Sequence, residues 1–233
     1  MSYLEIAKKT ITLIPARGGS KGILKKNIKK LLEKPLICWT IEAAKASSCV
    51  DRIVVSTEDK DIAKVAVESG AEVPFFRPNE LATDNAKSVD MALHAINNLP
   101  SYDWLLLLQP TSPLRTCDDI DKVFKFCFDK KASSVVSVCE VEQHPNKMYT
   151  INDSYKLNSL LSNHSEQERR QDLPRVFTTN GAIYLVNIAW FKKTKKYIDH
   201  DTIGYEMPLE RSIDIDTLND WYIAENILKD KIR

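Results

Sequence analysis

The residues with the most distinctive chemistry lie in the segment LIPARGGSKGILKKN, at positions 13–27. An apolar strand runs there into a turn that contains three glycines, Gly18, Gly19 and Gly22, and several cations, among them Arg17, Lys21 and Lys26. Glycine lets a backbone approach a phosphate closely. Arginine can hold two phosphate oxygens in a fork, and lysine adds a mobile charge. The turn therefore indicates a polyphosphate site, the ordinary alternative being a strand-to-helix turn with solvated lysines.

The spacing in this turn differs from two well-known phosphate-binding motifs. The P-loop pattern G-x-x-x-x-G-K-[ST] is absent, and so is the G-x-G-x-x-G pattern of dinucleotide-binding folds. The turn is therefore not a Walker A loop, and its spacing disfavours a dinucleotide as the ligand.

Two further polar segments could bind the rest of a substrate. RPNELATDNAKS, at positions 77–88, joins a loop of small polar residues to a helix start, where Ser88 can bond a base edge. QPTSPLR, at positions 109–115, follows an apolar strand, and its prolines stiffen the loop. The loop holds four polar side chains in place: Gln109, Thr111, Ser112 and Arg115. Such a loop suits a hydroxyl-rich or carboxylate-bearing substrate. The alternative for residues 77–88 is an ordinary capped start of a helix, and the alternative for residues 109–115 is a structural turn.

The acidic segment SIDID, at positions 212–216, suggests a metal site. On a strand, Asp214 and Asp216 would point to the same face because side chains alternate. Two neighbouring carboxylates repel unless a cation joins them, and hard oxygen ligands beside a phosphate site favour Mg²⁺. Asp216 or Thr217 could also cap the helix that follows.

Composition narrows the class of protein. The 233 residues, of which 43% are hydrophobic, suit one large domain or one domain with an insertion. A net charge of +1 gives no general attraction to nucleic acid or to a membrane. The chain has no apolar run of the ~18 residues that a membrane span needs and no signal-peptide pattern. Five cysteines without a CxxC pair are expected to be reduced thiols of a cytoplasmic protein.

Strand and helix patterns alternate along most of the chain. Strands are expected at residues 10–14, 52–56, 103–109, 132–141, 181–186 and 212–215. Helices are expected at residues 35–48, 59–69, 86–98, 116–130 and 217–231, with Thr57 capping the second and a T-x-x-D sequence starting the fourth. Apolar strands separated by amphipathic helices predict a mostly parallel α/β sheet with helices on both faces. Ligands bind such sheets at the carboxyl ends of the strands.

The alternating pattern breaks in the polar stretch 142–175. Within it, residues 148–151 and 155–161 have the composition of two short strands. We interpret this stretch as an insertion, a disordered loop being the alternative.

Taken together, five segments resemble the acylneuraminate cytidylyltransferases, also called CMP-sialic acid synthetases. That family carries ARGGSKGIPxKN, RPxELAxDxAxS, QPTSPLR, RQxLPxxFRxNGAIY and SIDIDxxxD in this order. The matching segments here are residues 16–27, 77–88, 109–115, 170–184 and 212–220. Any one of them is weakly specific, but the ordered set spans nearly the whole chain.

The resemblance implies a nucleotidyltransferase that moves CMP from CTP to the anomeric hydroxyl of a nine-carbon 2-keto sugar acid, releasing pyrophosphate, with Mg²⁺ as cofactor. The sugar is open between N-acetylneuraminic, legionaminic and pseudaminic acid. The implied fold is a Rossmann-like α/β domain for CTP (1–141 and 176–233) with an inserted dimerisation arm (142–175). Partners in the family's homodimers lend residues to each other's sugar pocket.

The resemblance also assigns roles to single residues. The implied catalytic residues are Arg17, Lys21, Asp214 and Asp216, the two aspartates being the Mg²⁺ ligands. The implied nucleotide-binding residues are Arg17, Gly18, Gly19, Ser20, Lys21, Lys26, Asn27, Arg77, Ala86 and Ser88, with the last three at the cytosine. The implied sugar-acid residues are Gln109, Thr111, Ser112, Lys147, Arg170 and Tyr184.

Two positions depart from the family pattern. Leu24 stands where the glycine loop usually has proline, and Thr178 stands where many members have arginine before NGAIY. A threonine cannot replace that charge, although Arg175, three residues earlier, is a candidate to do so. The departures concern recognition of the sugar acid more than that of the nucleotide.

Three other functions compete with this interpretation. A cytidylyltransferase for the eight-carbon sugar acid KDO would use similar parts. A GT-A glycosyltransferase also has an acidic metal motif, but that motif lies mid-chain, after the nucleotide half. A non-catalytic nucleotide-binding protein should have lost one of the catalytic elements, and all of them are present here.

Overall fold

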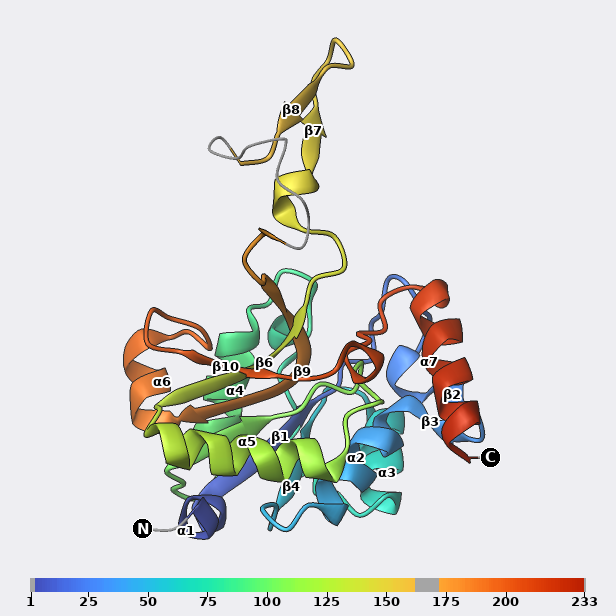
Figure 1. The fold of residues 1–233 in the computed structure, drawn as a ribbon. Helices are drawn as coiled ribbons and strands as arrows, with labels where there is room; N and C mark the ends of the chain where they lie inside the picture. The colour runs from blue at the N-terminus through green and yellow to red at the C-terminus, as the bar shows by residue number, and fades with distance from the viewer. Residues whose placement is uncertain (1–2, 162–171, 233) are drawn as a thin grey trace.

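A six-stranded sheet forms the centre of the molecule (Figure 1). The computed structural model describes residues 3–161 and 172–232. The strand order is β10-β6-β9-β5-β1-β4. The strands are β1 (Thr10–Pro15), β4 (Ile53–Ser56), β5 (Trp104–Leu107), β6 (Ser134–Glu140), β9 (Phe177–Asn187) and β10 (Ile203–Glu206). β9 is antiparallel to its neighbours β5 and β6, whereas the other pairs are parallel. The predicted mostly parallel α/β fold is therefore confirmed.

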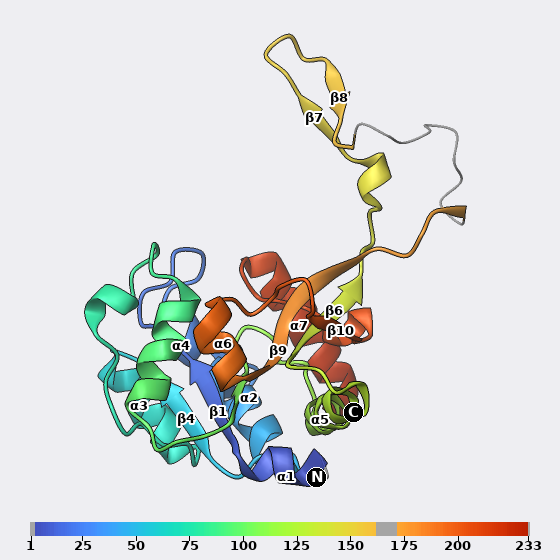
Figure 2. The same cartoon turned by 90° about the vertical axis from the view of Figure 1, so that its left-hand side faces the viewer.

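Helices cover both faces of the sheet because its strands are apolar on both faces. On β1, Ile14 packs in one buried cluster and its neighbour Leu13 in another. The first cluster includes α1 (Tyr3–Lys8), α2 (Leu36–Ala46), α3 (Lys60–Glu68) and α5 (Cys117–Lys130). The second includes α4 (Ser88–Asn97) and α6 (Ile188–Thr194). Figure 2 shows α5 on one side of the sheet and α4 on the other. Among the described residues, no helix is long and apolar enough to cross a membrane.

A third, smaller cluster holds the end of the chain against the segment after β1. There α7 (Leu218–Ile232) contributes Trp221, which packs with Ile23 of the glycine loop and with Ile215. The same cluster includes Leu31 of β2 (Lys30–Leu31) and Leu36, which directly follows β3 (Lys34–Pro35); β2 comes just after the short helix η1 (Lys26–Ile28). Packing of these side chains therefore brings the first and last chemical motifs of the sequence together.

The predicted elements agree with the structure in type except at residues 212–215, and three further details differ. Asp59, not Thr57, caps α3, and its carboxylate accepts from the N–H groups of Asp61 and Ile62. Residues 212–215 are not a strand; they follow the short helix η5 (Leu209–Arg211) as irregular backbone. The helix expected from residue 86 begins at Ser88. The sequence patterns missed α1, α6, β10, β2 and β3. The capping box expected from T-x-x-D is present at Thr116 and Asp119.

A narrow arm leaves the sheet where β6 ends. After η3 (Pro145–Lys147), β7 (Tyr149–Ile151) and β8 (Leu157–Ser159) form an antiparallel hairpin. Both views show the hairpin standing well away from the sheet and its helices (Figures 1 and 2). The two short strands predicted in this stretch are thus found, although each is shorter than expected.

A buried ion pair fixes the approach to residues 212–216. The Asp119 side chain is fully buried, and Arg211 donates to both of its oxygens, at 2.8 and 3.0 Å. Burial acts to raise the pKa of Asp119, but the bonds from Arg211 and Thr116 outweigh it and hold the pKa below its ordinary value. The pair ties α5 to η5, which directly precedes the acidic segment.

Replacing Arg211 by methionine should lower the free energy of unfolding by about 2–3 kcal/mol at neutral pH, because Asp119 would remain buried and charged. Because its pKa is lowered, Asp119 adds this stability above the ordinary carboxyl pKa and loses it as the pH falls further. The difference between the two proteins should therefore shrink in acid. Urea unfolding measures it.

Arg175→Met is the matched control. Arg175 pairs with Glu140 and Glu206, but all three side chains are about half exposed, so its removal should cost much less. Equal losses for the two variants would contradict the structural role given to Arg211.

Candidate active site

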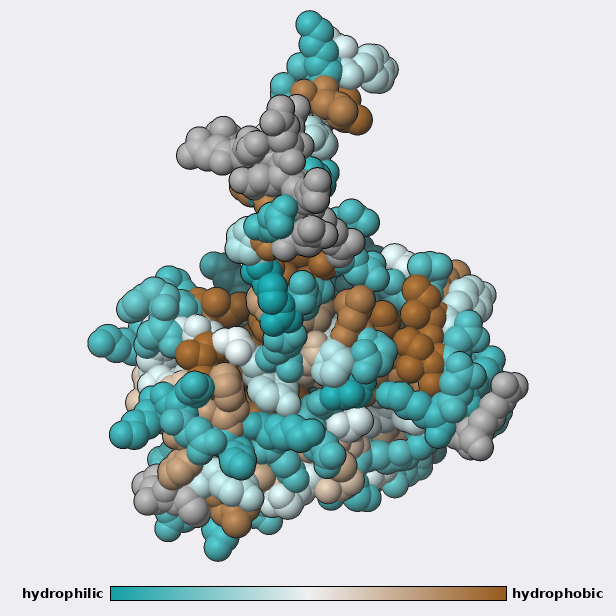
Figure 3. All heavy atoms as spheres, viewed as in Figure 1, coloured by the Kyte–Doolittle hydropathy of each residue, from teal (hydrophilic) through white to brown (hydrophobic). Residues whose placement is uncertain are grey.

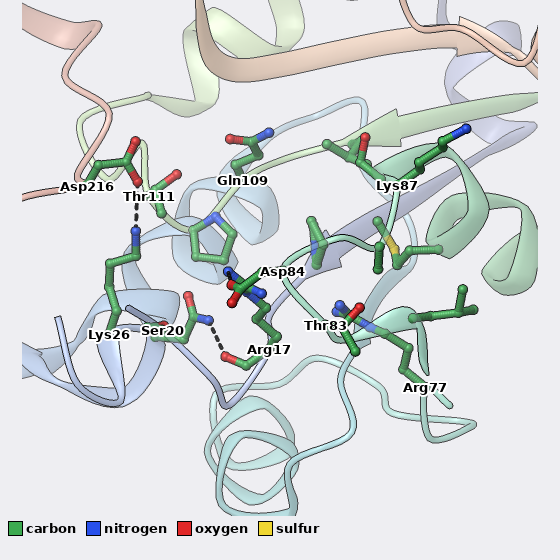
Figure 4. Close-up of a pocket in the computed structure, with 18 of the residues that line it drawn as sticks. Arg17, Ser20, Lys26, Arg77, Thr83, Asp84, Lys87, Gln109, Thr111 and Asp216 are labelled. Atoms are coloured by element: carbon green, nitrogen blue, oxygen red, sulfur yellow. Dashed lines mark hydrogen bonds and ion pairs between the residues drawn. The ribbon is translucent and has the colours of Figure 1, made fainter. Parts of the chain in front are cut away.

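One cavity of about 560 Å³ opens where the glycine loop, the start of α4 and the end of β5 meet (Figure 4). The glycine loop supplies Arg17, Ser20, Lys21, Gly22, Lys26 and Asn27. The segment before and into α4 supplies Arg77, Thr83, Asp84, Ala86, Lys87 and Ser88. Gln109, Thr111, Tyr184, Tyr197 and Asp216 complete the polar lining. Cations, carboxylates and neutral hydrogen-bonding groups therefore share one cavity.

Most of the predicted site residues line this cavity, and five of the described ones do not: Gly18, Gly19, Ser112, Lys147 and Asp214. Ser112 is fully buried, and its hydroxyl donates to the Asn180 carbonyl. Lys147 lies in η3, at the base of the arm. Arg170 lies outside the described residues.

The glycine loop is tied to the C-terminal acidic segment by direct contacts. Lys26 Nζ donates to the Ile215 carbonyl at 2.6 Å and pairs with an Asp216 carboxylate oxygen at 3.0 Å. A Cβ on Gly22 would lie 2.4 Å from the Asp216 carbonyl oxygen, so only glycine fits there. The amide of Asn27 donates to the Arg17 carbonyl at 2.9 Å and closes the loop on itself.

A carboxylate that sequence reasoning did not single out holds two cations of the loop. Asp84 pairs with Arg17 at 2.8 Å through one oxygen and with Lys21 at 2.9 Å through the other. The contacts of Lys21 and Arg17 keep the pKa of Asp84 below its ordinary value. In Figure 4, Arg17 and Asp84 lie side by side in the cavity lining. The glycine loop is thus fixed to the segment before α4 as well.

Arg77 lines the cavity, but its guanidinium is held by Ser56 of β4. Its Nε donates to the Ser56 hydroxyl at 3.2 Å, and its Nη2 donates to the Ser56 carbonyl. Burial lowers its pKa, an effect that the nearby Glu58 carboxylate opposes. Glu58 also accepts from the Gly18 N–H at 2.7 Å, so one carboxylate serves both Arg77 and the glycine loop.

A bulge in β9 explains the NGA sequence beside the cavity. The register between β6 and β9 shifts between Val136 and Val138. Gly181, with φ at +72°, lies in this shift, and a Cβ there would approach Gln109 Oε1 to 2.9 Å and Asp214 Oδ2 to 3.1 Å. The Asn180 side chain bonds Ser137 and Ser212. These contacts set Gln109 and Asp214 close to β9 without a strand at residues 212–215.

The two aspartates have different surroundings. Burial raises the pKa of Asp214, although a bond from Thr111 opposes it, and Asp214 Oδ1 is buried without a hydrogen-bond donor. The Asp216 side chain is 75% exposed and pairs with Lys26. Among the described residues, no set of three or more His, Cys, Asp or Glu side chains could hold a metal. Two carboxylates, one with an oxygen that has no hydrogen-bond donor, still fit Mg²⁺, which takes its other ligands from phosphates and water.

Arg175 does not compensate for the missing arginine at Thr178 within this chain. Its guanidinium bonds Glu140 at 2.8 Å and also Glu206, and it lies 4.8 Å from the centre of the Phe177 ring. These contacts are at the root of the arm, and Arg175 is not among the cavity-lining residues. Within this chain, the positive charge that many family members have at the position of Thr178 is therefore not replaced by Arg175.

Sequence reasoning missed three residues that shape the cavity: Asp84, Glu58 and Tyr197. Asp84 belongs to the polar segment 77–88, but its ion-pair partners, Arg17 and Lys21, are distant along the chain. Tyr197 follows α6, a helix that the periodicity did not reveal, and its hydroxyl donates to the Ser88 carbonyl at 3.0 Å. Its ring packs 5.3 Å from that of Tyr184. A glycine inside a strand pattern was the one available signal for the β9 bulge.

A family model described as cytidylyltransferase matches residues 11–227. The chain belongs to the cytidylyltransferase family. The acylneuraminate branch that the motifs resemble is confirmed by a CMP-N,N'-diacetyllegionaminic acid synthase of Legionella pneumophila. It is 35% identical over 231 residues, covering 94% of this chain and 96% of the relative. A pseudaminic acid cytidylyltransferase of Campylobacter jejuni is 31% identical, covering 95% and 97%.

The cytidylyltransferase relatives differ in length. An N-acylneuraminate cytidylyltransferase of Streptococcus agalactiae is 36% identical over 91% of this chain, but the match covers 52% of the relative. The chain thus spans about half the length of that relative. A solved CMP:2-keto-3-deoxy-manno-octonic acid synthetase, complexed with CTP, has a TM-score of 0.73 at 15% identity, covering 96% of this chain and 99% of that one. This likeness shows that the two proteins share a fold.

Gly22→Ala should lower the free energy of unfolding by about 1–3 kcal/mol, because the new methyl group would overlap the Asp216 backbone. Gly19→Ala is the control, since a Cβ at Gly19 meets no atom within 4 Å. Urea unfolding of both variants measures the difference. Equal stability would show that the glycine loop and residue 216 are not in contact.

Proposed function

We propose that the chain transfers CMP from CTP to the anomeric hydroxyl of a nine-carbon 2-keto sugar acid. The observation that carries the proposal is one cavity lined by Arg17, Lys21 and Lys26 on one side and by Gln109, Tyr184 and Asp216 on another. A polyphosphate site, a polar organic site and a carboxylate thus converge. The names of the three relatives support the same reaction for this chain.

The cavity residues divide into three groups under this proposal. Arg17, Ser20, Lys21, Lys26 and Asn27 would hold the triphosphate, with the backbone of Gly18 and Gly19 behind them. Arg77, Ala86 and Ser88 would surround the cytosine. Gln109, Thr111 and Tyr184 would bind the sugar acid, with Ser112 supporting the loop from beneath. In the reaction, a new bond forms from the hydroxyl oxygen to the α-phosphorus, and the bond from the α-phosphorus to the oxygen that bridges to the β-phosphate breaks. The hydroxyl proton passes to a base or to water, and pyrophosphate leaves.

Displacement at phosphorus asks a protein mainly for positioning and for neutralisation of charge. Arg17, Lys21 and Lys26 supply fixed positive charge where pyrophosphate would depart. Asp214 and Asp216 would hold Mg²⁺, since Asp214 Oδ1 is buried without a donor and Asp216 lies at the cavity. Bound there, Mg²⁺ would neutralise phosphate charge and stabilise the leaving pyrophosphate.

Several arguments bear on the competing functions. The relatives at 31–36% identity are named for acylneuraminic, legionaminic and pseudaminic acids, which favours a nine-carbon substrate over KDO. Because these three names differ at similar identity, they do not choose among the acids. Lys26 and Asp216 are in contact across the cavity edge, which argues against a decayed, purely binding protein.

We also propose that residues 142–175 form the dimerisation arm of a homodimer. A two-stranded hairpin alone is only marginally stable in water. This one exposes Ile151 and Leu157 by 66% and 63%, and Figure 3 shows brown apolar side chains on the arm. A second copy would cover these side chains. It would also bring Lys147, and Arg170 from outside the described residues, to the partner's sugar site.

The purified chain should release pyrophosphate from CTP and Mg²⁺ in the presence of one or more nine-carbon acids. The assay panel contains N-acetylneuraminic, legionaminic, pseudaminic and KDO acids, with coupled detection of pyrophosphate. Release with a nine-carbon acid, and little with KDO, is the expected result. Release with KDO alone would favour the eight-carbon function, and CTP binding without release on any acid would favour a binding protein.

Asp216→Ala serves as the catalytic control for this assay. Loss of a Mg²⁺ ligand should lower turnover about a hundredfold or more, while the fold survives because the side chain is largely exposed. Asp90→Ala, an exposed aspartate of α4 outside the cavity, should retain activity. Full turnover by Asp216→Ala at low Mg²⁺ would remove Asp216 from the metal site.

Replacing Ile151 and Leu157 together by lysine should convert the dimer to a monomer, because both apolar contacts would become charged. Light scattering coupled to gel filtration measures the mass, and circular dichroism checks the fold. Ile198→Lys, at a position 49% exposed away from the arm, should leave the mass unchanged. A wild-type monomer, or a double variant that still dimerises, would contradict the arm's role.

A further inference from the structure

Asp84 holds the cations of the glycine loop in a way that resembles a phosphate. Each of its oxygens contacts a different cation, Arg17 at 2.8 Å and Lys21 at 2.9 Å. A phosphate group would present two oxygens to the same pair. Arg17 also donates to the Ala82 carbonyl at 3.4 Å, so two contacts hold its guanidinium against residues 82–84.

These two cations are also the ones that the proposed reaction needs for the triphosphate. The third cation of the loop that lines the cavity, Lys26, is paired with Asp216. A triphosphate that entered beside an intact Asp84 would place phosphate oxygens close to a carboxylate, and like charges at such range repel. The carboxylate and the triphosphate therefore compete for Arg17 and Lys21.

The position of Asp84 allows it to give way. It lies in an exposed turn between η2 (Asn79–Leu81) and α4, closed by a bond from the Ala86 N–H to the Thr83 carbonyl. Its side chain is 41% exposed and that of Lys21 is 81% exposed. Exposed pairs of this kind are weak, so moving the carboxylate aside disturbs no buried group.

We propose that Asp84 is a placeholder for a polyphosphate: it orients Arg17 and Lys21 while the cavity is free of nucleotide, and the triphosphate displaces it. This inference rests on the proposed function only for the identity of the anion. Asp84 thus lowers the affinity of the cavity for polyphosphates, because the ligand must displace it from Arg17 and Lys21. Replacing Asp84 should therefore strengthen polyphosphate binding. Replacing a residue that merely braced the fold, or that helped to hold the nucleotide, would weaken it.

The test is calorimetric binding of inorganic pyrophosphate and of CTP to the full chain, with and without Mg²⁺. Asp84→Asn should bind both about threefold to tenfold more tightly than the wild type, as expected for loss of two exposed ion pairs that compete with the ligand. Binding of cytidine, which has no phosphate, should not change. Asp84→Glu, which keeps the charge, should stay close to the wild type.

Two further variants separate competition from a general effect of charge. Asp90→Asn removes an exposed carboxylate of α4 outside the cavity and should leave pyrophosphate affinity unchanged. In a Lys21→Ala background, the gain from Asp84→Asn should shrink, because one of the contested cations is gone. An equal gain in both backgrounds would overturn the placeholder.

Equal or weaker binding of pyrophosphate by Asp84→Asn would overturn the inference and would make Asp84 a structural brace or part of the ligand site. This result is distinct from failure of the proposed function. Pyrophosphate binding is measured without a sugar acid and without turnover. Tighter binding by Asp84→Asn in a chain that never releases pyrophosphate from CTP would retain the placeholder and reject the transferase.

Discussion

The contact between the glycine loop and residues 215–216 is the constraint on which the rest of the cavity depends. Lys26 bonds the Ile215 carbonyl, Gly22 leaves room for the Asp216 backbone, and the Ile215 N–H donates to the Thr111 carbonyl. Through these contacts, segments from the start, middle and end of the chain meet at one point. The buried Ile215 side chain then anchors the junction in the core formed with α7.

Buried polar groups behind the cavity hold its loops without facing the ligand. Arg115 is fully buried and donates to the carbonyls of Gln109 and Ala182 and to the Thr40 hydroxyl. Burial lowers its pKa to about 9, although the charge of the Asp119 carboxylate opposes this shift. Such a cation is costly to bury, and its bonds rigidly join α2, the QPTSPLR loop and β9. Preorganised loops of this kind favour binding because little ordering remains to be done.

The sequence predicted which segments meet at the cavity, but it predicted less well how their residues are placed there. The turn after β1 and the loop after β5 were expected near each other, because both follow carboxyl ends of parallel strands. Asp214 and Asp216 were expected on a strand, and that premise was wrong: η5, the Arg211 pair and the β9 bulge place them instead. Asp84 could not be found from periodicity, since its ion pairs join segments that are distant along the chain. Local patterns reveal which residues are polar, whereas such pairings are set by tertiary structure.

The two sides of the cavity differ in the positive charge that a single chain supplies to them. On the side proposed for the triphosphate, Arg17, Lys21 and Lys26 are each held by an aspartate. On the side proposed for the sugar acid, the lining residues Gln109, Thr111 and Tyr184 are neutral, Thr178 brings no charge, and Arg175 is bound at the arm's root. A sugar acid carries a carboxylate that needs a cation. In the proposed homodimer, the arm, with Lys147 at its base, would bring one from a second subunit, so selectivity for the acid would depend on assembly whereas nucleotide binding would not.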